Sequence, residues 1–124
     1  MDMNRKAYTV APDNLLCGAA HPLDMRTIVI KNPKCEIARG SLIKASSEGI
    51  YFIAGDVNSE STELTGDAIG ILGHSLAADD SSETLTAAVY VSGGFNKNGI
   101  TGINDYVLKD QDILSAQKYG LYIH

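Results

Sequence analysis

The sequence predicts an α+β fold that is mostly β: a compact domain of short antiparallel strands with one short C-terminal helix. Three observations lead to this prediction. The chain has 124 residues, which suits a single domain with one core. Short runs of β-branched and aliphatic residues alternate with turns rich in Gly, Asn and Asp. Helical spacing of apolar residues begins late, after residue 110.

Residues 1–24 are predicted to form a loose N-terminal arm that precedes a β-rich domain of residues 25–124. Pro12, Gly18 and Pro22 break any periodic pattern, and the alanines of this stretch offer little to bury. A segment of this composition is usually mobile unless a partner holds it. We therefore expect regular structure to begin near residue 25.

The predicted strands follow one another along the chain, and each is ended by a turn signal. Turns are expected at Asn32-Pro33-Lys34, at Arg39-Gly40 and around Ser46 to Gly49, and a polar surface loop at residues 55–66. A charged turn at Asp79 to Glu83 separates the last two strands, which we expect to pair antiparallel. The strands themselves are expected at residues 26–30, 41–44, 50–53, 67–76 and 84–91.

The last two of these strands are expected to supply much of the core. Side chains alternate between the two faces of a strand, so one set points inward. The residues predicted to be mostly buried are Ile69, Ile71, Leu72, Leu85, Val89 and Val91. Gly70 and Gly73 interrupt the aliphatic run, which indicates a close approach by a neighbouring backbone or a β-bulge.

The C-terminal residues change from strand to helix and back. Ile113, Leu114 and Gln117 have helical spacing, with Asp110 as the predicted N-cap. Gly120 is expected to end the helix in the left-handed conformation. Residues 121–124 then return to strand character.

Composition narrows the classes of partner. Fifteen acidic residues against ten basic ones give a net charge of −5. A negative surface repels phosphate backbones and anionic membranes, so we expect neither nucleic acid nor membrane as a partner. No apolar run approaches the roughly 18 residues that a membrane span needs, and the first residues lack the apolar stretch of a signal peptide. We therefore expect a protein made in a cytoplasm, with Cys17 and Cys35 as free thiols.

Three short patterns could suggest a catalytic or metal site, and each lacks a feature that such a site needs. The glycines of residues 66–73 are followed by His74-Ser75 rather than by the Gly-Lys-Ser/Thr of a phosphate-binding loop. His74 and Ser75 are sequence neighbours, which point to opposite faces of a strand and do not form a triad with Asp79 or Asp80. The acidic loop holding Asp56, Asn58, Glu60 and Glu63 lacks calcium-loop spacing. The sequence therefore predicts no enzyme activity, no cofactor and no metal site.

Four blocks in order resemble the lambda-type head decoration proteins of tailed bacteriophages. The two central blocks are Gly66-Asp67-Ala68-Ile69-Gly70-Ile71-Leu72 and, after a short acidic turn, the strand from Leu85 to the Gly93-Gly94-Phe95 turn. Upstream, Arg39-Gly40-Ser41-Leu42-Ile43 is similar to the family strand that precedes a variable polar loop. Downstream, residues 113–123 resemble the helix–glycine–strand ending of related prophage proteins.

The resemblance implies a structural virion protein that is not an enzyme. It implies a homotrimer that binds the major capsid protein on the outside of the mature capsid, at local threefold axes. Bound there, the protein would stabilise the shell against the pressure of packaged DNA. The family's N-terminal arm becomes ordered on the capsid, and the residues expected to bind it here are Arg5, Lys6, Tyr8 and Val10.

An alternative from another class stays open. A small β-barrel module that binds a carbohydrate or a peptide would have a similar strand content. Such a module needs a concave site with one or two aromatic side chains, and the six tyrosines are scattered along the chain.

Overall fold

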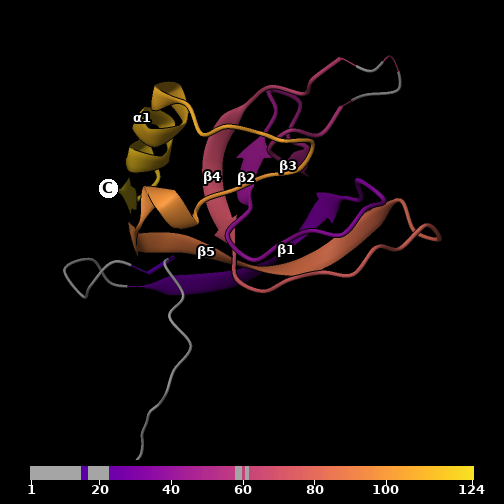
Figure 1. Ribbon diagram of the computed structural model, residues 1–124, viewed down its shortest axis with the longest axis horizontal. Helices are drawn as coiled ribbons and strands as arrows, with labels where there is room; N and C mark the ends of the chain where they lie inside the picture. The colour runs from indigo at the N-terminus through magenta and orange to yellow at the C-terminus, as the bar shows by residue number, and fades with distance from the viewer. Residues whose placement is uncertain (1–14, 17–22, 58–59, 61) are drawn as a thin grey trace, which may run out of the picture.

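A six-stranded sheet, curled into a half-barrel, forms the body of the molecule, and one short helix packs against it (Figure 1). The computed structural model describes residues 15–16, 23–57, 60 and 62–124. The predicted fold class, mostly antiparallel β with one short helix near the C-terminus, is confirmed. The elements are β1 (Asp24–Lys31), β2 (Leu42–Ala45), β3 (Tyr51–Ile53), β4 (Asp67–Leu72), β5 (Thr84–Phe95), the 3-10 turn η1 (Lys97–Gly99), α1 (Asp110–Lys118) and β6 (Leu121–Ile123).

Strand β5 pairs with three other strands, β1, β4 and β6. The order of the sheet is β1-β5-β4-β2-β3, and β6 lies beside β5 off this path. The predicted antiparallel pairing of the last two long strands is confirmed, because Ile71 and Leu72 of β4 lie opposite Tyr90 and Val89. β5 runs four residues past the predicted end at residue 91, since its last three residues pair with β6. That pair is parallel, which differs from the all-antiparallel prediction.

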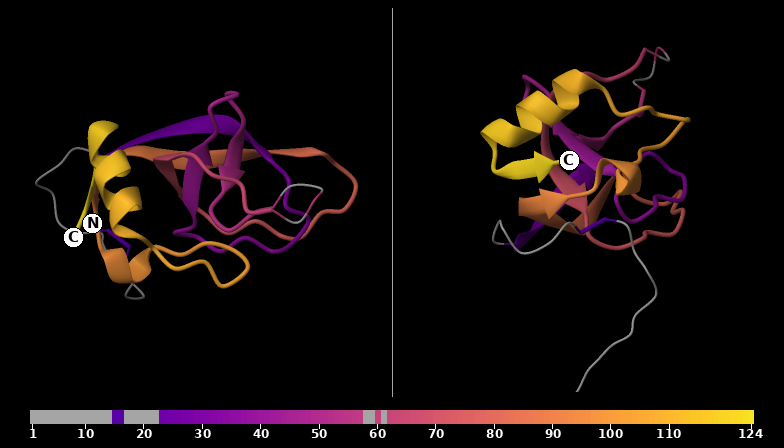
Figure 2. Two further views of the ribbon diagram at one scale, coloured as in Figure 1. Left: turned by 90° about the horizontal axis from the view of Figure 1, so that it is seen from above. Right: turned by 60° about the vertical axis from the view of Figure 1, so that its left-hand side comes forward.

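The curl of the sheet brings its two edge strands, β1 and β3, close to each other (Figure 2). A buried carboxylate ties them together: Lys31 Nζ at the end of β1 lies 2.9 Å from Asp56 Oδ2, just beyond β3. Asp56 belongs to the predicted polar surface loop, so that prediction is wrong for this residue. Through its ion pair with Lys31, Asp56 attaches the start of this loop to the end of β1.

Both faces of the sheet are packed. One cluster of buried side chains, the helix-side core, includes Leu42, Ile71, Tyr90 and Phe95 and is covered by Ala116 of α1. The second, the inner core, receives side chains from each of β1 to β5, as expected for the inside of a curled sheet. Its buried members are Ile30, Ile37, Ile43, Ile53, Leu72, Ala87, Val89 and Ile103.

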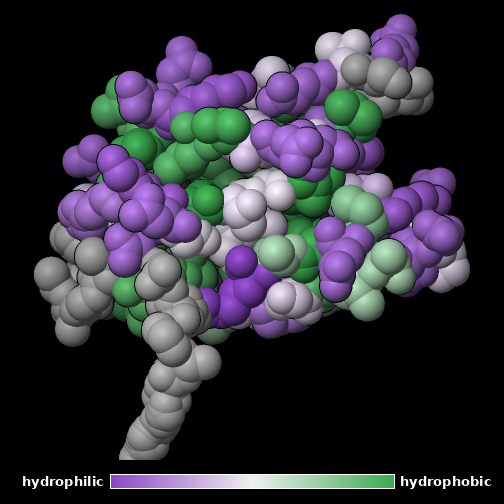
Figure 3. All heavy atoms as spheres, in the orientation of Figure 1, coloured by the Kyte–Doolittle hydropathy of each residue, from purple (hydrophilic) through white to green (hydrophobic). Residues whose placement is uncertain are grey.

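The outer surface contrasts with these two clusters. Hydrophilic side chains, drawn in purple, cover most of the face seen in Figure 3, and apolar side chains, drawn in green, show between them.

The predicted core residues are present in these clusters, although not all of them are fully buried. Ile71, Leu72 and Val89 are fully buried. The other three pack against the inner core and are only partly buried: Ile69, Leu85 and Val91.

Gly70 occupies a β-bulge where β4 pairs with β2. Ile43 and Lys44 are consecutive on β2, yet they face Gly70 and Ala68, so Ile69 is the extra residue. A Cβ on Gly70 would lie only 2.4 Å from Val89 Cγ1. The predicted bulge is therefore confirmed, and the predicted backbone approach is that of the Tyr90 carbonyl oxygen, which would lie 3.2 Å from the same Cβ.

The helix α1 is short, and each of its ends has a local cause. Its N-cap is Lys109, so the prediction of Asp110 in that role is wrong. Asp112 explains the difference: its carboxylate reaches back to accept the Lys109 N–H at 3.0 Å, which fixes the start of the helix one residue earlier. Gly120 has φ +90°, which confirms the predicted left-handed end.

Part of the predicted arm belongs to the folded domain. Leu15 is buried in the helix-side core, and its carbonyl accepts the Asn96 N–H at 2.7 Å. Asp24 is the first residue of β1. The rest of the predicted arm, residues 1–14 and 17–22, lies outside the described residues.

Candidate functional site

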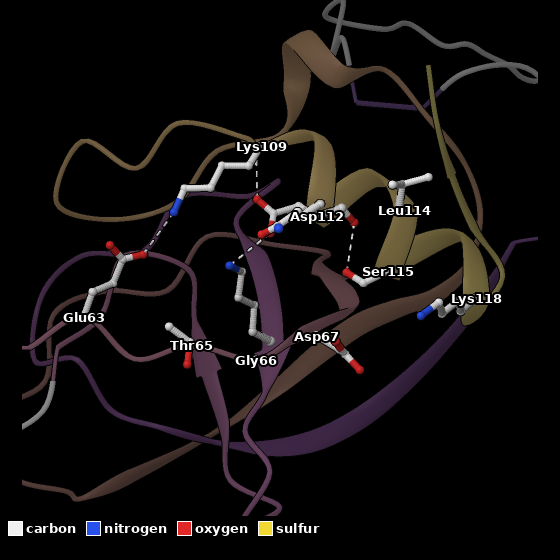
Figure 4. A pocket seen from close by; sticks show the side chains of 11 residues that line it. Glu63, Thr65, Gly66, Asp67, Lys109, Asp112, Leu114, Ser115 and Lys118 are labelled. Atoms are coloured by element: carbon white, nitrogen blue, oxygen red, sulfur yellow. Dashed lines mark hydrogen bonds and ion pairs between the residues drawn. The ribbon is translucent and has the colours of Figure 1, made fainter.

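An open, polar pocket between α1 and the start of β4 is the best-formed candidate site of the described chain (Figure 4). The loop that leads into β4 forms one wall, and the first two turns of α1 form the other. Its floor is Lys44, a buried lysine from the middle of β2. The lining residues are Lys44, Glu63, Thr65, Gly66, Asp67, Lys109, Gln111, Asp112, Leu114, Ser115 and Lys118.

The floor of the pocket is an ion pair between β2 and α1. Lys44 Nζ lies 3.0 Å from Asp112 Oδ1, and both side chains are more than nine-tenths buried. The other carboxylate oxygen, Oδ2, accepts the Tyr106 hydroxyl and the Lys109 backbone N–H. The Tyr106 ring packs 4.8 Å from Lys44 Nζ, measured to the ring centroid. The strand β2, the segment before α1 and α1 itself therefore converge on one carboxylate.

Burial and hydrogen bonding act in opposite directions on this carboxylate. Burial by itself would raise the pKa of Asp112, but the donors from Tyr106, Lys109 and Lys44 outweigh it and hold that pKa below its usual value. For the phenol the two effects add. Burial, and then the hydrogen bond to Asp112, raise the pKa of Tyr106 far above its usual value.

This arrangement works as an anchor. Asp112 is ionised at neutral pH, and each of its oxygens already accepts from the protein. Ser115 adds a second link between the elements, because its Oγ accepts the Ala68 N–H at 3.1 Å and donates to the Asp112 carbonyl. The chemistry of the pocket floor is therefore the attachment of α1 to the sheet.

The rim of the pocket is charged but balanced. Lys109 Nζ lies 3.7 Å from Glu63 Oε2, with both side chains about half exposed, so this pair adds little stability. Lys118 lines the outer end of the pocket, and Asp67 accepts the Tyr119 hydroxyl at 3.3 Å. The lining holds three lysines and three carboxylates, which gives no net attraction for an ion of either sign.

The glycines of residues 66–73 lie in and beside β4, and His74 and Ser75 lie in the loop that follows it. Gly66 packs against the backbone of β2, where a Cβ would meet Ala45 O at 2.2 Å. His74 Nε2 accepts the Ala88 N–H at 3.4 Å, while Ser75 Oγ accepts the Arg39 N–H at 3.2 Å. The two neighbouring side chains have different partners, but they lie beyond the end of β4 at Leu72, so the predicted strand of residues 67–76 is too long and its alternation is not the reason.

The acidic residues of the predicted surface loop also lie at separate places in the structure, and so does the one described cysteine. Glu63 is at the pocket rim, and Asp56 pairs with Lys31 at the seam between β1 and β3. Cys35 is a half-buried free thiol whose pKa is raised by burial and by Asp56. Among the described residues, no group of three or more His, Cys, Asp and Glu side chains is arranged to hold a metal ion. Cys17, His21 and Asn58 lie outside the described residues.

The residues that the sequence analysis predicted to form a binding site are not the residues that form the floor of the pocket. The residues predicted to bind a capsid, Arg5, Lys6, Tyr8 and Val10, lie outside the described part of the chain. Lys44, Tyr106 and Asp112 were missed. One signal was available, since a lysine stands between the aliphatic residues of a very short strand and therefore needs a buried partner.

No protein-family model matches the chain, and no curated protein is significantly similar to it. Within the part of the chain that the structure describes, no helix is both long enough and apolar enough to span a membrane.

Proposed function

We propose that this chain is a structural virion protein of a tailed bacteriophage, a decoration protein that binds the outside of the mature capsid. It binds the major capsid protein as a homotrimer at local threefold axes and stabilises the shell against the pressure of the packaged DNA. Its chemistry is that of binding alone, with no catalysis.

One observation carries the proposal: four sequence blocks occur in the same order as in the lambda-type decoration proteins. The blocks also lie together in the fold of this chain. The blocks form β2, the β4–β5 pair and the α1–β6 ending, and these elements share the helix-side core. Agreement in the order and spacing of several blocks is stronger support than any one short motif.

The proposed contact with the shell is the N-terminal segment, through Arg5, Lys6, Tyr8 and Val10. Arg5 and Lys6 are adjacent basic residues in a chain of net charge −5. An extended segment can add strand contacts to the sheet edge of a partner. Ordering it costs about 1 kcal/mol per residue in backbone entropy, and three linked copies would offset that cost by multivalency.

Capsid binding is the direct test. Expanded and unexpanded heads, assembled from the major capsid protein encoded in the same genome, are mixed with the chain and sedimented. We expect saturable binding to expanded heads and little binding to unexpanded ones. Absence of binding to both kinds of head would refute the proposal.

Truncation of the N-terminal arm tests whether the arm carries the capsid binding. Deleting residues 1–12 spares the buried Leu15, so the melting temperature should stay within a few degrees of the parent. Affinity for expanded heads should fall at least tenfold. Parental occupancy by the truncated chain would move the binding face to the folded domain.

The carbohydrate- or peptide-binding module is the competing function. It predicts a monomer that does not bind expanded heads and that binds a small ligand in a concave site. The same sedimentation experiment therefore decides between the two.

A further inference from the structure

The pocket between α1 and the start of β4 (Figure 4) adjoins a second hollow, beside the turn that follows β2. Both hollows are lined by Thr65, Gly66 and Asp67, and the second is completed by Tyr119, the C-cap residue of α1. We call the two hollows together the helix-edge groove. Their volumes are about 350 Å³ and about 320 Å³, and small-molecule sites usually have about 300 to 1,000 Å³. Each hollow can therefore hold a ligand group of the size of one sugar ring.

The charges of the groove cancel, and uncharged polar groups remain. Three lysines and three carboxylates line the first hollow, and Asp67, which belongs to both, is the charged residue of the second. The side chains of Thr65, Gln111 and Ser47 are exposed and make no hydrogen bond to the described part of the chain. A hydroxyl or an amide group can both donate and accept. The groove therefore suits an uncharged ligand that carries several hydroxyl groups.

The floor of the groove holds a buried donor that the protein satisfies only in part. The ammonium of Lys44 has three N–H donors, and among the described residues it has one hydrogen-bonding oxygen, Asp112 Oδ1 at 3.0 Å. The Tyr106 ring covers a further side of this ammonium. The Lys44 side chain is only 7% exposed, and a buried donor without an acceptor is costly. A ligand hydroxyl that reaches the floor can accept the remaining N–H.

An aromatic ring lines the second hollow. Tyr119 is 49% exposed, and its hydroxyl donates to Asp67 Oδ2 at 3.3 Å. This hydrogen bond holds the ring in place before a ligand arrives, so little ordering is needed on binding. The face of an aromatic ring is electron-rich and attracts the polarised C–H groups of a sugar ring. The groove thus combines a stacking surface with a set of hydrogen-bonding groups.

From these contacts we infer that the helix-edge groove binds a neutral oligosaccharide. One sugar ring stacks on Tyr119 in the second hollow. The next sugar lies in the first hollow, where its hydroxyls bond to Thr65, Gln111 and the Lys44 ammonium. The inference goes beyond the proposed function, because binding in this groove requires neither the N-terminal segment nor a capsid. A decoration protein with this site would attach the phage head to a polysaccharide surface.

Titration of the free chain with four neutral tetrasaccharides tests the inference without any capsid. The probes are cellotetraose, maltotetraose, a β-linked galactose tetramer and a tetramer of N-acetylglucosamine. We expect at least one of them to bind with a Kd of about 1 mM or tighter. Its binding should shift the backbone amide NMR signals of Thr65, Gly66, Asp67 and Tyr119. No binding of any probe at about 10 mM, or shifts confined to residues outside the groove, would overturn the inference.

Variants of two tyrosines test whether the ring carries the binding. Tyr119→Ala removes the stacking face, so the affinity for the bound tetrasaccharide should fall about tenfold or more. Tyr119→Phe keeps the ring and should stay within about threefold of the parent. Tyr51→Ala is the matched control, because Tyr51 is 39% exposed and lies on β3, outside the groove. Equal losses in Tyr119→Ala and Tyr51→Ala would contradict a site on Tyr119.

A second pair of variants keeps the test decisive if Tyr119→Ala unfolds, which its melting temperature shows. Gln111→Ala and Gln117→Ala change two exposed positions of α1, where alanine is well tolerated. Only Gln111 lines the groove. We expect Gln111→Ala to weaken tetrasaccharide binding about threefold or more and Gln117→Ala to leave it unchanged, and equal affinities of the two would overturn the inference.

The outcomes separate this inference from the proposed function. A chain that binds a tetrasaccharide in the groove but does not bind expanded heads supports the inference and refutes the proposed function. A chain that binds expanded heads but none of the four tetrasaccharides refutes the inference and leaves the proposed function standing.

Discussion

Asp112 is the side chain on which the attachment of α1 depends. Replacing it with Asn keeps the size but leaves the Lys44 ammonium buried without a counter-charge. We expect Asp112→Asn to lower the free energy of unfolding by about 3 kcal/mol, as for other broken buried pairs. Lys44→Met should cost less, because Asp112 keeps the donors from Tyr106 and Lys109. Urea denaturation of both variants checks this, and equal losses would contradict the assigned order.

The same carboxylate predicts a dependence of stability on pH. The pKa of Asp112 is depressed in the folded state, so its contribution is present above the unfolded value of about 3.9 and is lost as the pH falls through the folded value. The difference in unfolding free energy between the parent and Asp112→Asn should therefore narrow on acidification from about pH 6 to about pH 3. A constant difference over that range would mean that its partners do not hold Asp112 in the ionised form.

At the scale of the elements, β5 is the strand whose inward face must stay apolar. Val89 is fully buried in the inner core and lies opposite Leu72 of β4. Val89→Asp should lower the free energy of unfolding by several kcal/mol, because it buries an unpaired charge. Thr86→Asp, on the exposed face of the same strand, should cost less than about 1 kcal/mol. Thermal melting of the two variants tests which face of β5 points into the inner core. Similar melting temperatures would mean that Val89 does not point inward.

The whole molecule is proposed to act as a trimer, and the mass of the free protein tests that directly. One chain has a mass of 13.2 kDa. Sedimentation equilibrium at micromolar and at millimolar concentration should give three times this mass, at least at the higher concentration, because weak closed assemblies form by mass action. A single-chain mass throughout would leave only trimerisation on the capsid, and a two-chain mass would contradict the threefold arrangement.

The sequence by itself determined the class of the fold and most of its elements. Local chemistry was sufficient for this: β-branched runs, turn residues, and a helical spacing ended by Gly120. The close approach at Gly70 was predicted as well, because a glycine inside an aliphatic strand usually marks a bulge or a backbone that a neighbour approaches closely. The strands, turns and helix depend on residues close in sequence, which is why they could be predicted from sequence alone, whereas the atoms that approach Gly70 belong to β5 and β2 and were identified only by the structure.

Apart from the β4–β5 pair, only the tertiary structure decided which strands are neighbours, and it alone decided which polar side chains are buried together. The parallel β5–β6 pair, and the edges of β1 and β3 joined by Lys31 and Asp56, unite residues remote in sequence. The pocket floor is the clearest case, since Lys44 and Asp112 are 68 positions apart and only 3.0 Å apart in space. Nothing local marks either residue as the partner of the other. A buried charge is stable only beside its counter-charge, and the packing of α1 against the sheet brings the two together.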